Sequence, residues 1–171
     1  MKKTAWLSAM LATVVLGCAD SRAPAEYVFD QGLGDLFVVR VAGNIVAPSL
    51  VGSVEFAASM FGTRLVVVMG HSQCGAVAAT VHALEHGGNP ESRNLSSIVD
   101  RIKPHIEHLF DGPASRDDRI KAAVRVNAVA SARELSRSSP ILQELVEIGR
   151  VVIAPAVLDL ATGVVEFLER S

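Results

Sequence analysis

The stretch Cys18-Ala19-Asp20-Ser21-Arg22 follows directly on the apolar run Ala12-Thr13-Val14-Val15-Leu16-Gly17. The same arrangement returns further along the chain, where His71-Ser72-Gln73-Cys74-Gly75 follows Leu65-Val66-Val67-Val68-Met69-Gly70. Each apolar run is short, rich in β-branched residues and closed by glycine, which is typical of a buried strand. The sequence therefore predicts two strands that each carry metal-ligand residues at their C-terminal ends.

These residues can meet only if the two strands are neighbours. Ligands of open α/β sheets bind at the carboxyl ends of adjacent strands, so we expect Cys18, His71 and Cys74 to lie close together there. Two thiolates and one imidazole suit zinc, with a fourth position for water or for Asp20. Taken singly, each residue is explained as well by an ordinary buried cysteine or histidine. As a set they favour a zinc site, either catalytic or purely structural.

The motif Cys-x-Asp-Ser-Arg followed by His-x-x-Cys resembles the β-class carbonic anhydrases. The segments from Phe29 to Asn44 and from Leu158 to Val165 are similar to further parts of that family, and the resemblance covers roughly residues 12 to 169. It implies one Zn²⁺ per chain and the reversible hydration of carbon dioxide to bicarbonate and a proton by zinc-bound hydroxide. It also implies a homodimer or tetramer.

The resemblance assigns roles to individual residues. It implies that Arg22 pairs with Asp20 and that Asp20 accepts a hydrogen bond from zinc-bound hydroxide, or binds zinc directly in a closed state. The backbone N–H of Gly75, at the start of a predicted helix, is a candidate to stabilise negative charge on the substrate. Phe37 resembles a residue that lines the substrate pocket near the subunit interface, although a core phenylalanine is an equal alternative. Arg40 is either an edge or interface charge or a partner of the loop that holds Asp20.

Some positions depart from the family pattern. Val15 stands where some members carry the tryptophan of a non-catalytic bicarbonate pocket, which argues against that pocket here. Ala9 replaces a glutamine that can bind substrate, and Val157-Leu158 stand where a tyrosine is common. The segment ahead of the first strand is also shorter than the helical arm usual in the family.

The remaining patterns predict a single α/β domain over residues 1–171. Its central, mostly parallel sheet has strand order 2-1-3-4, with a last antiparallel strand at one edge and helices on its faces. Strands are expected at 12–17, 36–41, 65–70, 151–156 and 164–167, and helices starting at 23–26 and spanning 49–61, 75–85, 95–110 with a kink at Pro104, 115–138 and 140–147.

Composition limits the partners and the compartment. The formal net charge is −2 with no basic cluster, which argues against a nucleic-acid partner. Half of the residues are hydrophobic, so apolar surface is buried against another subunit or part of the chain is a membrane signal. If both cysteines bind zinc, no disulfide is left, which fits a reducing, cytoplasmic location.

The N-terminus allows a conflicting interpretation. Residues 1–11 are either a shortened arm or part of a signal-like segment, because Met1-Lys2-Lys3 precedes an apolar stretch that reaches Gly17. Val15-Leu16-Gly17-Cys18 even resembles a lipoprotein cleavage box, and cleavage there would lipidate Cys18 and export the protein. The zinc interpretation excludes this and is favoured, because the motif continues through Arg22. The apolar run is too short for a confident membrane span.

Other functions share the same residues. The same hydroxide could hydrolyse carbonyl sulfide or carbon disulfide, and a non-catalytic zinc-binding protein or a lipoprotein of unknown role are rivals from other classes. The histidine pairs at 82 and 86 and at 105 and 108 are interpreted as solvated helix faces rather than as further ligands or proton shuttles.

Overall fold

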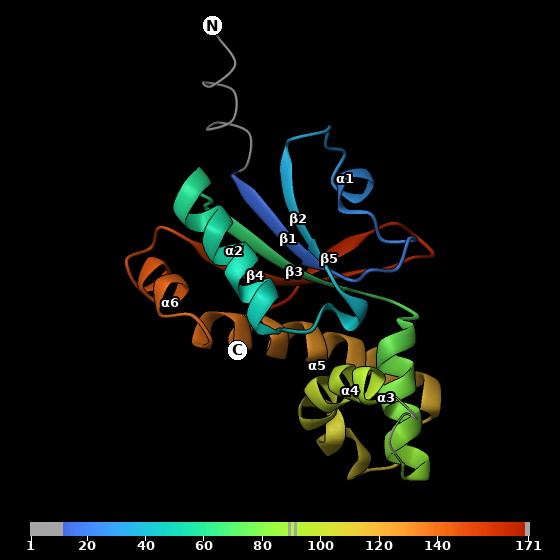
Figure 1. Cartoon of the computed structure of the whole chain (residues 1–171). Helices are drawn as coiled ribbons and strands as arrows, with labels where there is room; N and C mark the ends of the chain where they lie inside the picture. Colours follow the sequence, from blue (N-terminus) through green and yellow to red (C-terminus); the bar gives the residue numbers. More distant parts are fainter. Residues whose placement is uncertain (1–11, 89, 91, 170–171) are drawn as a thin grey trace, which may run out of the picture.

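Within residues 12–88, 90 and 92–169, which the computed structural model describes, five strands form one sheet of order β2-β1-β3-β4-β5 (Figure 1). The pairs β2–β1, β1–β3 and β3–β4 are parallel, and β5 is antiparallel to β4. The strands are β1 (Thr13–Gly17), β2 (Leu36–Arg40), β3 (Leu65–His71), β4 (Val152–Leu158) and β5 (Val165–Phe167). The predicted fold class and strand order are confirmed.

Helices α4, α5 and α6 begin directly after a serine that caps them. Ser92, Ser115 and Ser139 each accept a hydrogen bond from a backbone amide in the first turn that follows them. The helices are α1 (Ala25–Val28), α2 (Pro48–Phe61), α3 (Gly75–His86), α4 (Arg93–Ile106), α5 (Arg116–Arg137) and α6 (Pro140–Glu147), with 3₁₀ turns at Ala42–Asn44 and Glu107–Phe110. The turn after β2 was not predicted. The helix expected over 95–110 is α4, which continues through Pro104, followed by the second 3₁₀ turn.

The side chains of the strands alternate between two apolar layers. Val14 and Leu16 of β1 pack with α2, α5 and α6, which cover one face of the sheet (Figure 1). Val15 points to the opposite face, into a cluster that includes Ala25 of α1. A third cluster lies beyond the carboxyl ends of β1 and β3, where α3, α4 and α5 meet around Cys18 and Cys74. Both cysteines are therefore set in a packed apolar surrounding.

Strand β1 lies inside the sheet, with hydrogen-bonded neighbours on both sides. Cleavage before Cys18 would remove this strand from the sheet; the location of the protein stays a prediction. The predictions for residues 1–11 lie outside the described residues. Every helix in the described part of the chain is too short or too polar to cross a membrane.

Candidate metal centre

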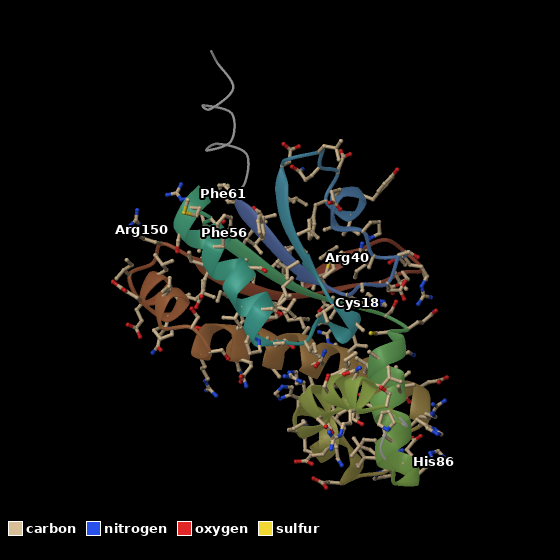
Figure 2. All side chains as sticks on the ribbon, in the orientation of Figure 1. Cys18, Arg40, Phe56, Phe61, His86 and Arg150 are labelled. Carbon is tan, nitrogen blue, oxygen red and sulfur yellow. The ribbon has the colours of Figure 1, made fainter. Side chains whose placement is uncertain are left out.

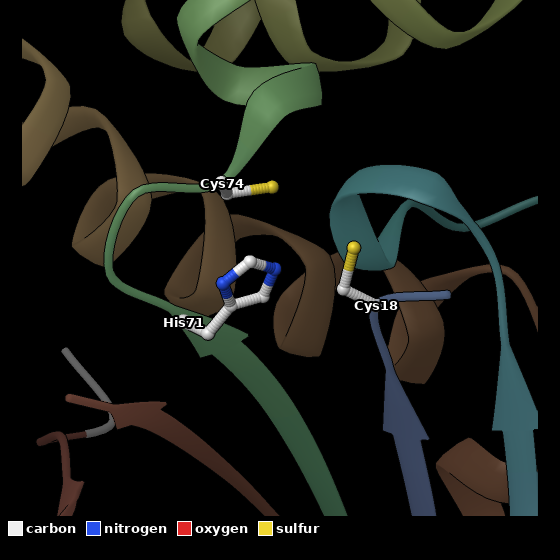
Figure 3. A group of neighbouring side chains, drawn as sticks. All are labelled: Cys18, His71 and Cys74. Atoms are coloured by element: carbon white, nitrogen blue, oxygen red, sulfur yellow. The ribbon is translucent and has the colours of Figure 1, made fainter. Parts of the chain in front are cut away.

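The side chains of Cys18, His71 and Cys74, called the ligand group from here on, converge at the carboxyl ends of β1 and β3 (Figure 3). Cys18 follows the last residue of β1, His71 is the last residue of β3, and Cys74 directly precedes α3. Their ligand atoms all lie within 4.8 Å of one another, and all three residues are buried. The parallel register of β1 and β3, which pairs Gly17 with Met69, is what brings the two strand ends together.

One ring nitrogen of His71 has a hydrogen-bond partner in the described part of the chain, and the other has none. Its Nδ1 lies 2.8 Å from the carbonyl oxygen of Ser72, and because a carbonyl only accepts, Nδ1 carries the hydrogen. Nε2 therefore has the lone pair, and it is buried without a hydrogen-bond partner among the described residues. A backbone carbonyl that orients the far nitrogen is the usual arrangement of a metal-binding histidine.

Electrostatics within the ligand group also favour a cation. The Cys74 thiol donates to Cys18 and lowers the pKa of Cys18 well below its usual range, with His71 and backbone amides assisting against the effect of burial. The same pairing, together with burial, raises the pKa of Cys74. Burial lowers the pKa of His71, but the Cys18 thiolate and the Ser72 carbonyl give a net upward shift. A metal ion that takes both sulfurs would replace the proton they share.

The backbone around Cys18 is held by residues from β2 and the turn after it. Arg40 donates from Nε to the carbonyl oxygen of Cys18 at 2.8 Å and from Nη2 to the carbonyl oxygen of Asp20. The backbone amide of Gly43 donates to Cys18 Sγ at 3.4 Å. Of the alternatives for Arg40, which is labelled in Figure 2, the structure therefore shows a partner of the loop that holds Asp20.

Asp20 and Arg22 form a bidentate pair beside the ligand group. Arg22 Nε lies 2.9 Å from Oδ1 of Asp20 and Nη2 lies 2.7 Å from Oδ2. These hydrogen bonds hold the pKa of Asp20 well below its usual range. Oδ2 of Asp20 is also 4.0 Å from Nε2 of His71. Asp20 thus borders the ligand group as an ionised acceptor while both of its oxygens are engaged by Arg22.

Comparison with known sequences decides the family. Residues 13–165 match the sequence model described as carbonic anhydrase. The chain belongs to the β-carbonic anhydrase family. A carbonic anhydrase of Mycolicibacterium smegmatis is 42% identical over 153 residues, which are 90% of this chain and 72% of that protein.

Two further relatives show how far the likeness extends. Carbonic anhydrase 2 of Mycobacterium tuberculosis is 45% identical over 93 residues, which are 54% of this chain and only 44% of that protein. A structure described as one of two tetrameric β-carbonic anhydrases from Sordaria macrospora superposes with a TM-score of 0.80 at 23% identity, covering 93% of this chain and 81% of that one. At that identity the superposition shows the fold alone.

In the structure of this β-carbonic anhydrase, the predicted site residue Gly75 lies beside the ligand group, whereas Phe37 does not. Gly75 is the first residue of α3, next to Cys74, and a Cβ built on it would meet nothing within 4 Å. Phe37 lies apart from the ligand group, because it pairs with Val14 at the other end of the strands. Its ring packs 6.4 Å from that of Phe56 and 6.1 Å from that of Phe61, both on α2 (Figure 2). Within one chain, Phe37 belongs to this aromatic cluster; its role at a subunit interface stays a prediction.

The remaining histidines lie outside the ligand group. His82 and His86 stack on each other along α3, with ring centroids 4.2 Å apart, and His86 lies at the far end of that helix (Figure 2). His82, His86 and His108 are exposed, as predicted for solvated faces, whereas His105 is half-buried and its burial lowers its pKa.

Sequence reasoning missed the residues that support the ligand group from a distance. The roles of Gly43 and of Asn127, a buried residue of α5, were not predicted. The sequence did contain a signal for Asn127, because an amide side chain interrupts an apolar stripe of that helix.

Proposed function

We propose that this protein is a zinc enzyme that interconverts carbon dioxide and bicarbonate. The observation that carries the proposal is the buried ligand group of two sulfurs and one imidazole nitrogen, with the Asp20–Arg22 pair at its border. The names of the relatives, which are carbonic anhydrases, support the same reaction.

The ligand group suits zinc in the number and kind of its donors. Structural zinc sites have four protein ligands, whereas catalytic sites have three and keep one position for water or substrate. Cys18, His71 and Cys74 supply three, and Asp20 is held by Arg22. When bound, zinc would make water a nucleophile at near-neutral pH.

Asp20 and Gly75 supply the groups that the reaction needs beside the metal. Because Arg22 keeps Asp20 ionised, its carboxylate can only accept a hydrogen bond, which orients the attacking oxygen. The amide of Gly75 belongs to the unsatisfied first turn of α3, where negative charge is favoured. We assign it to the oxygen of carbon dioxide that becomes negative during attack.

We also propose that the chain works as a homodimer or tetramer. Large apolar side chains are exposed on the single chain, among them Tyr27, Leu33, Val164 and Phe167. Their exposure fits side chains that a second copy of the chain covers. The tetrameric description of the Sordaria macrospora protein is consistent with this assembly.

The direct test is stopped-flow measurement of carbon dioxide hydration by the zinc-loaded chain, from slightly acidic to alkaline pH. We expect a rate that rises with pH and disappears when a chelator removes the metal. Carbonyl sulfide and carbon disulfide are offered in parallel to the same sample. Full zinc occupancy without carbon dioxide hydration would overturn the proposal, in favour of a sulfur-analogue hydrolase if those substrates react and of a non-catalytic zinc protein if they do not.

A further inference from the structure

Asn127 is a polar side chain on an otherwise apolar face of α5. It is 1% exposed and has Ala123, Val124 and Ala128 as buried neighbours on the helix. A buried amide costs free energy unless it forms hydrogen bonds, so a specific partner is expected. That partner is distant in the sequence, because Nδ2 of Asn127 donates to the carbonyl oxygen of Gly43 at 2.8 Å.

Gly43 has little freedom in its position. Its φ of +73° lies in the left-handed region. A Cβ at this residue would stand 2.8 Å from Cδ1 of Ile102 and 3.0 Å from Cβ of Ala76, so the backbone packs directly against α3 and α4. The carbonyl of Gly43 is bound by Asn127, while its amide points at Sγ of Cys18 at 3.4 Å. The two peptide groups of Gly43 therefore connect α5 to one of the metal ligands.

We infer that Asn127 is a positioning residue of the metal centre, which holds Gly43 so that its backbone amide donates to the Cys18 thiolate. This inference rests on the proposed metal site. Hydrogen bonds to a metal-bound sulfur tune the metal from outside its ligands. Such a hydrogen bond draws electron density from the sulfur, so the sulfur donates less electron density to the metal.

The effect has a clear sign for this ligand group. Two thiolates nearly neutralise a divalent cation, which makes it a weaker acid toward water than a cation held by neutral ligands. A hydrogen bond to Cys18 offsets part of that loss. Asn127 keeps this arrangement although its own Oδ1 has no hydrogen-bond partner among the described residues, an unfavourable state that packing alone does not explain.

Cobalt replaces zinc in such sites and reports on its thiolates through a charge-transfer absorption band. The experiment compares the full cobalt-loaded chain with the variants Asn127→Leu and Ser131→Ala. Ser131 is the matched control, because it is buried one turn further along α5. We expect the band to move to longer wavelength in Asn127→Leu only, since an unbonded thiolate gives up an electron more easily. Cobalt affinity should also fall by about tenfold or more, because Gly43 and Cys18 are then less firmly positioned for the metal.

Asn127→Ser covers the case in which the leucine variant does not fold, because serine keeps a polar group but is too short to reach Gly43. For the wild-type chain, loading with NMR-active cadmium tests the contact directly through spin coupling between the metal and the amide proton of Gly43. An unshifted band in a variant that binds cobalt, or the lack of that coupling, would overturn the inference. A wild-type chain that binds neither metal would overturn the proposed site itself, and the inference with it.

Discussion

The guanidinium of Arg40 donates to the carbonyl oxygen of Cys18 at 2.8 Å, so the last residue of β2 holds the backbone of a ligand-group residue that follows β1. A second nitrogen of Arg40 binds the carbonyl of Asp20. Arg40 touches neither the sulfur nor the carboxylate in these contacts. It fixes instead the short segment that carries both.

Replacing Arg40 should therefore weaken metal binding. The change Arg40→Met keeps much of the length of the side chain but removes both donors, and we expect about a tenfold loss of zinc affinity, measured by competition with a chelating dye. Arg101→Met is the matched control, because Arg101 also donates to backbone carbonyls, those of Val46 and Ser97, outside the ligand group. Equal affinities in the two variants would contradict the role of Arg40.

Removal of one sulfur should empty the metal centre. Cys74→Ser replaces a thiolate with a hydroxyl that stays protonated near neutral pH, so the variant should lose most of its bound zinc and its activity. Elemental analysis after gel filtration measures the zinc content. Met69→Leu, which removes a buried sulfur outside the ligand group, should keep full zinc. Zinc retention by the Cys74 variant would refute the site as described.

Asp20→Asn separates metal binding from catalysis. The amide of asparagine cannot replace the carboxylate that Arg22 keeps ionised. Zinc should therefore stay bound while the hydration rate falls by about a hundredfold. Stopped-flow rates per bound zinc measure the effect. Glu85→Gln is the control, because Glu85 is likewise a carboxylate paired with arginine, here with Arg116 at 3.2 Å and Arg119 at 3.5 Å. A similar loss in both variants would point to general destabilisation.

Two glycines allow steric crowding to be separated from backbone strain. Gly43 and Gly62 have similar φ values of +73° and +67°, but a Cβ on Gly62 would meet nothing within 4 Å. Gly62→Ala should lower the free energy of unfolding by about 1 kcal/mol through strain alone. Gly43→Ala should lower it by about 3 kcal/mol, because overpacking is added. Denaturant unfolding of both variants tests this, and equal losses would exclude crowding at Gly43.

The edge strand should respond to acid through one ion pair. Arg125 donates to both carboxylate oxygens of Glu166, at 2.6 and 2.8 Å, and these bonds lower the pKa of Glu166 below its ordinary value of 4.5. Because the pKa is lower in the folded chain, the stabilisation is present above pH 4.5 and is lost as the pH falls through the folded value.

Hydrogen exchange of the β5 amides measures that loss. Glu166→Gln should reduce their protection at neutral pH and make little difference in acid, whereas Glu107→Gln, on an exposed residue outside this pair, should leave β5 unchanged at both. A variant whose effect on β5 is the same at both pH values would show that the ion pair contributes nothing there.

Local patterns were sufficient to predict much of this structure. The valine-rich runs before Cys18 and His71 predicted adjacent strands, and the need to bring their ends together predicted the strand order. The residues that hold the ligand group in position could not be predicted from such local patterns. The bond from Asn127 to Gly43 joins residues 84 positions apart, and no periodicity encodes a contact between a helix and a distant turn.

Phe37 shows the opposite difficulty. Its place in a motif suggested either a substrate pocket near the subunit interface or the core, and the strand register that sets Gly17 against Arg40 sets Phe37 against Val14, away from the ligand group of its own chain. Side chains on a strand alternate between faces, and the layer that Phe37 faces is filled by α2. A single sequence contains no information on whether a second chain brings this ring to another metal centre.

The arrangement of the ligand group on β1 and β3 has a consequence for the unfolded chain. The segment between Cys18 and His71 contains α1, β2, α2 and β3 up to its last residue, His71, so an ion that binds both residues would close a long loop. A cross-link of this kind removes conformational entropy from the disordered chain, and the effect grows slowly with the length of the loop. Bound metal would then cross-link early and middle parts of the polypeptide, and loss of the ion would lower the free energy needed to detach the strand that precedes Cys18.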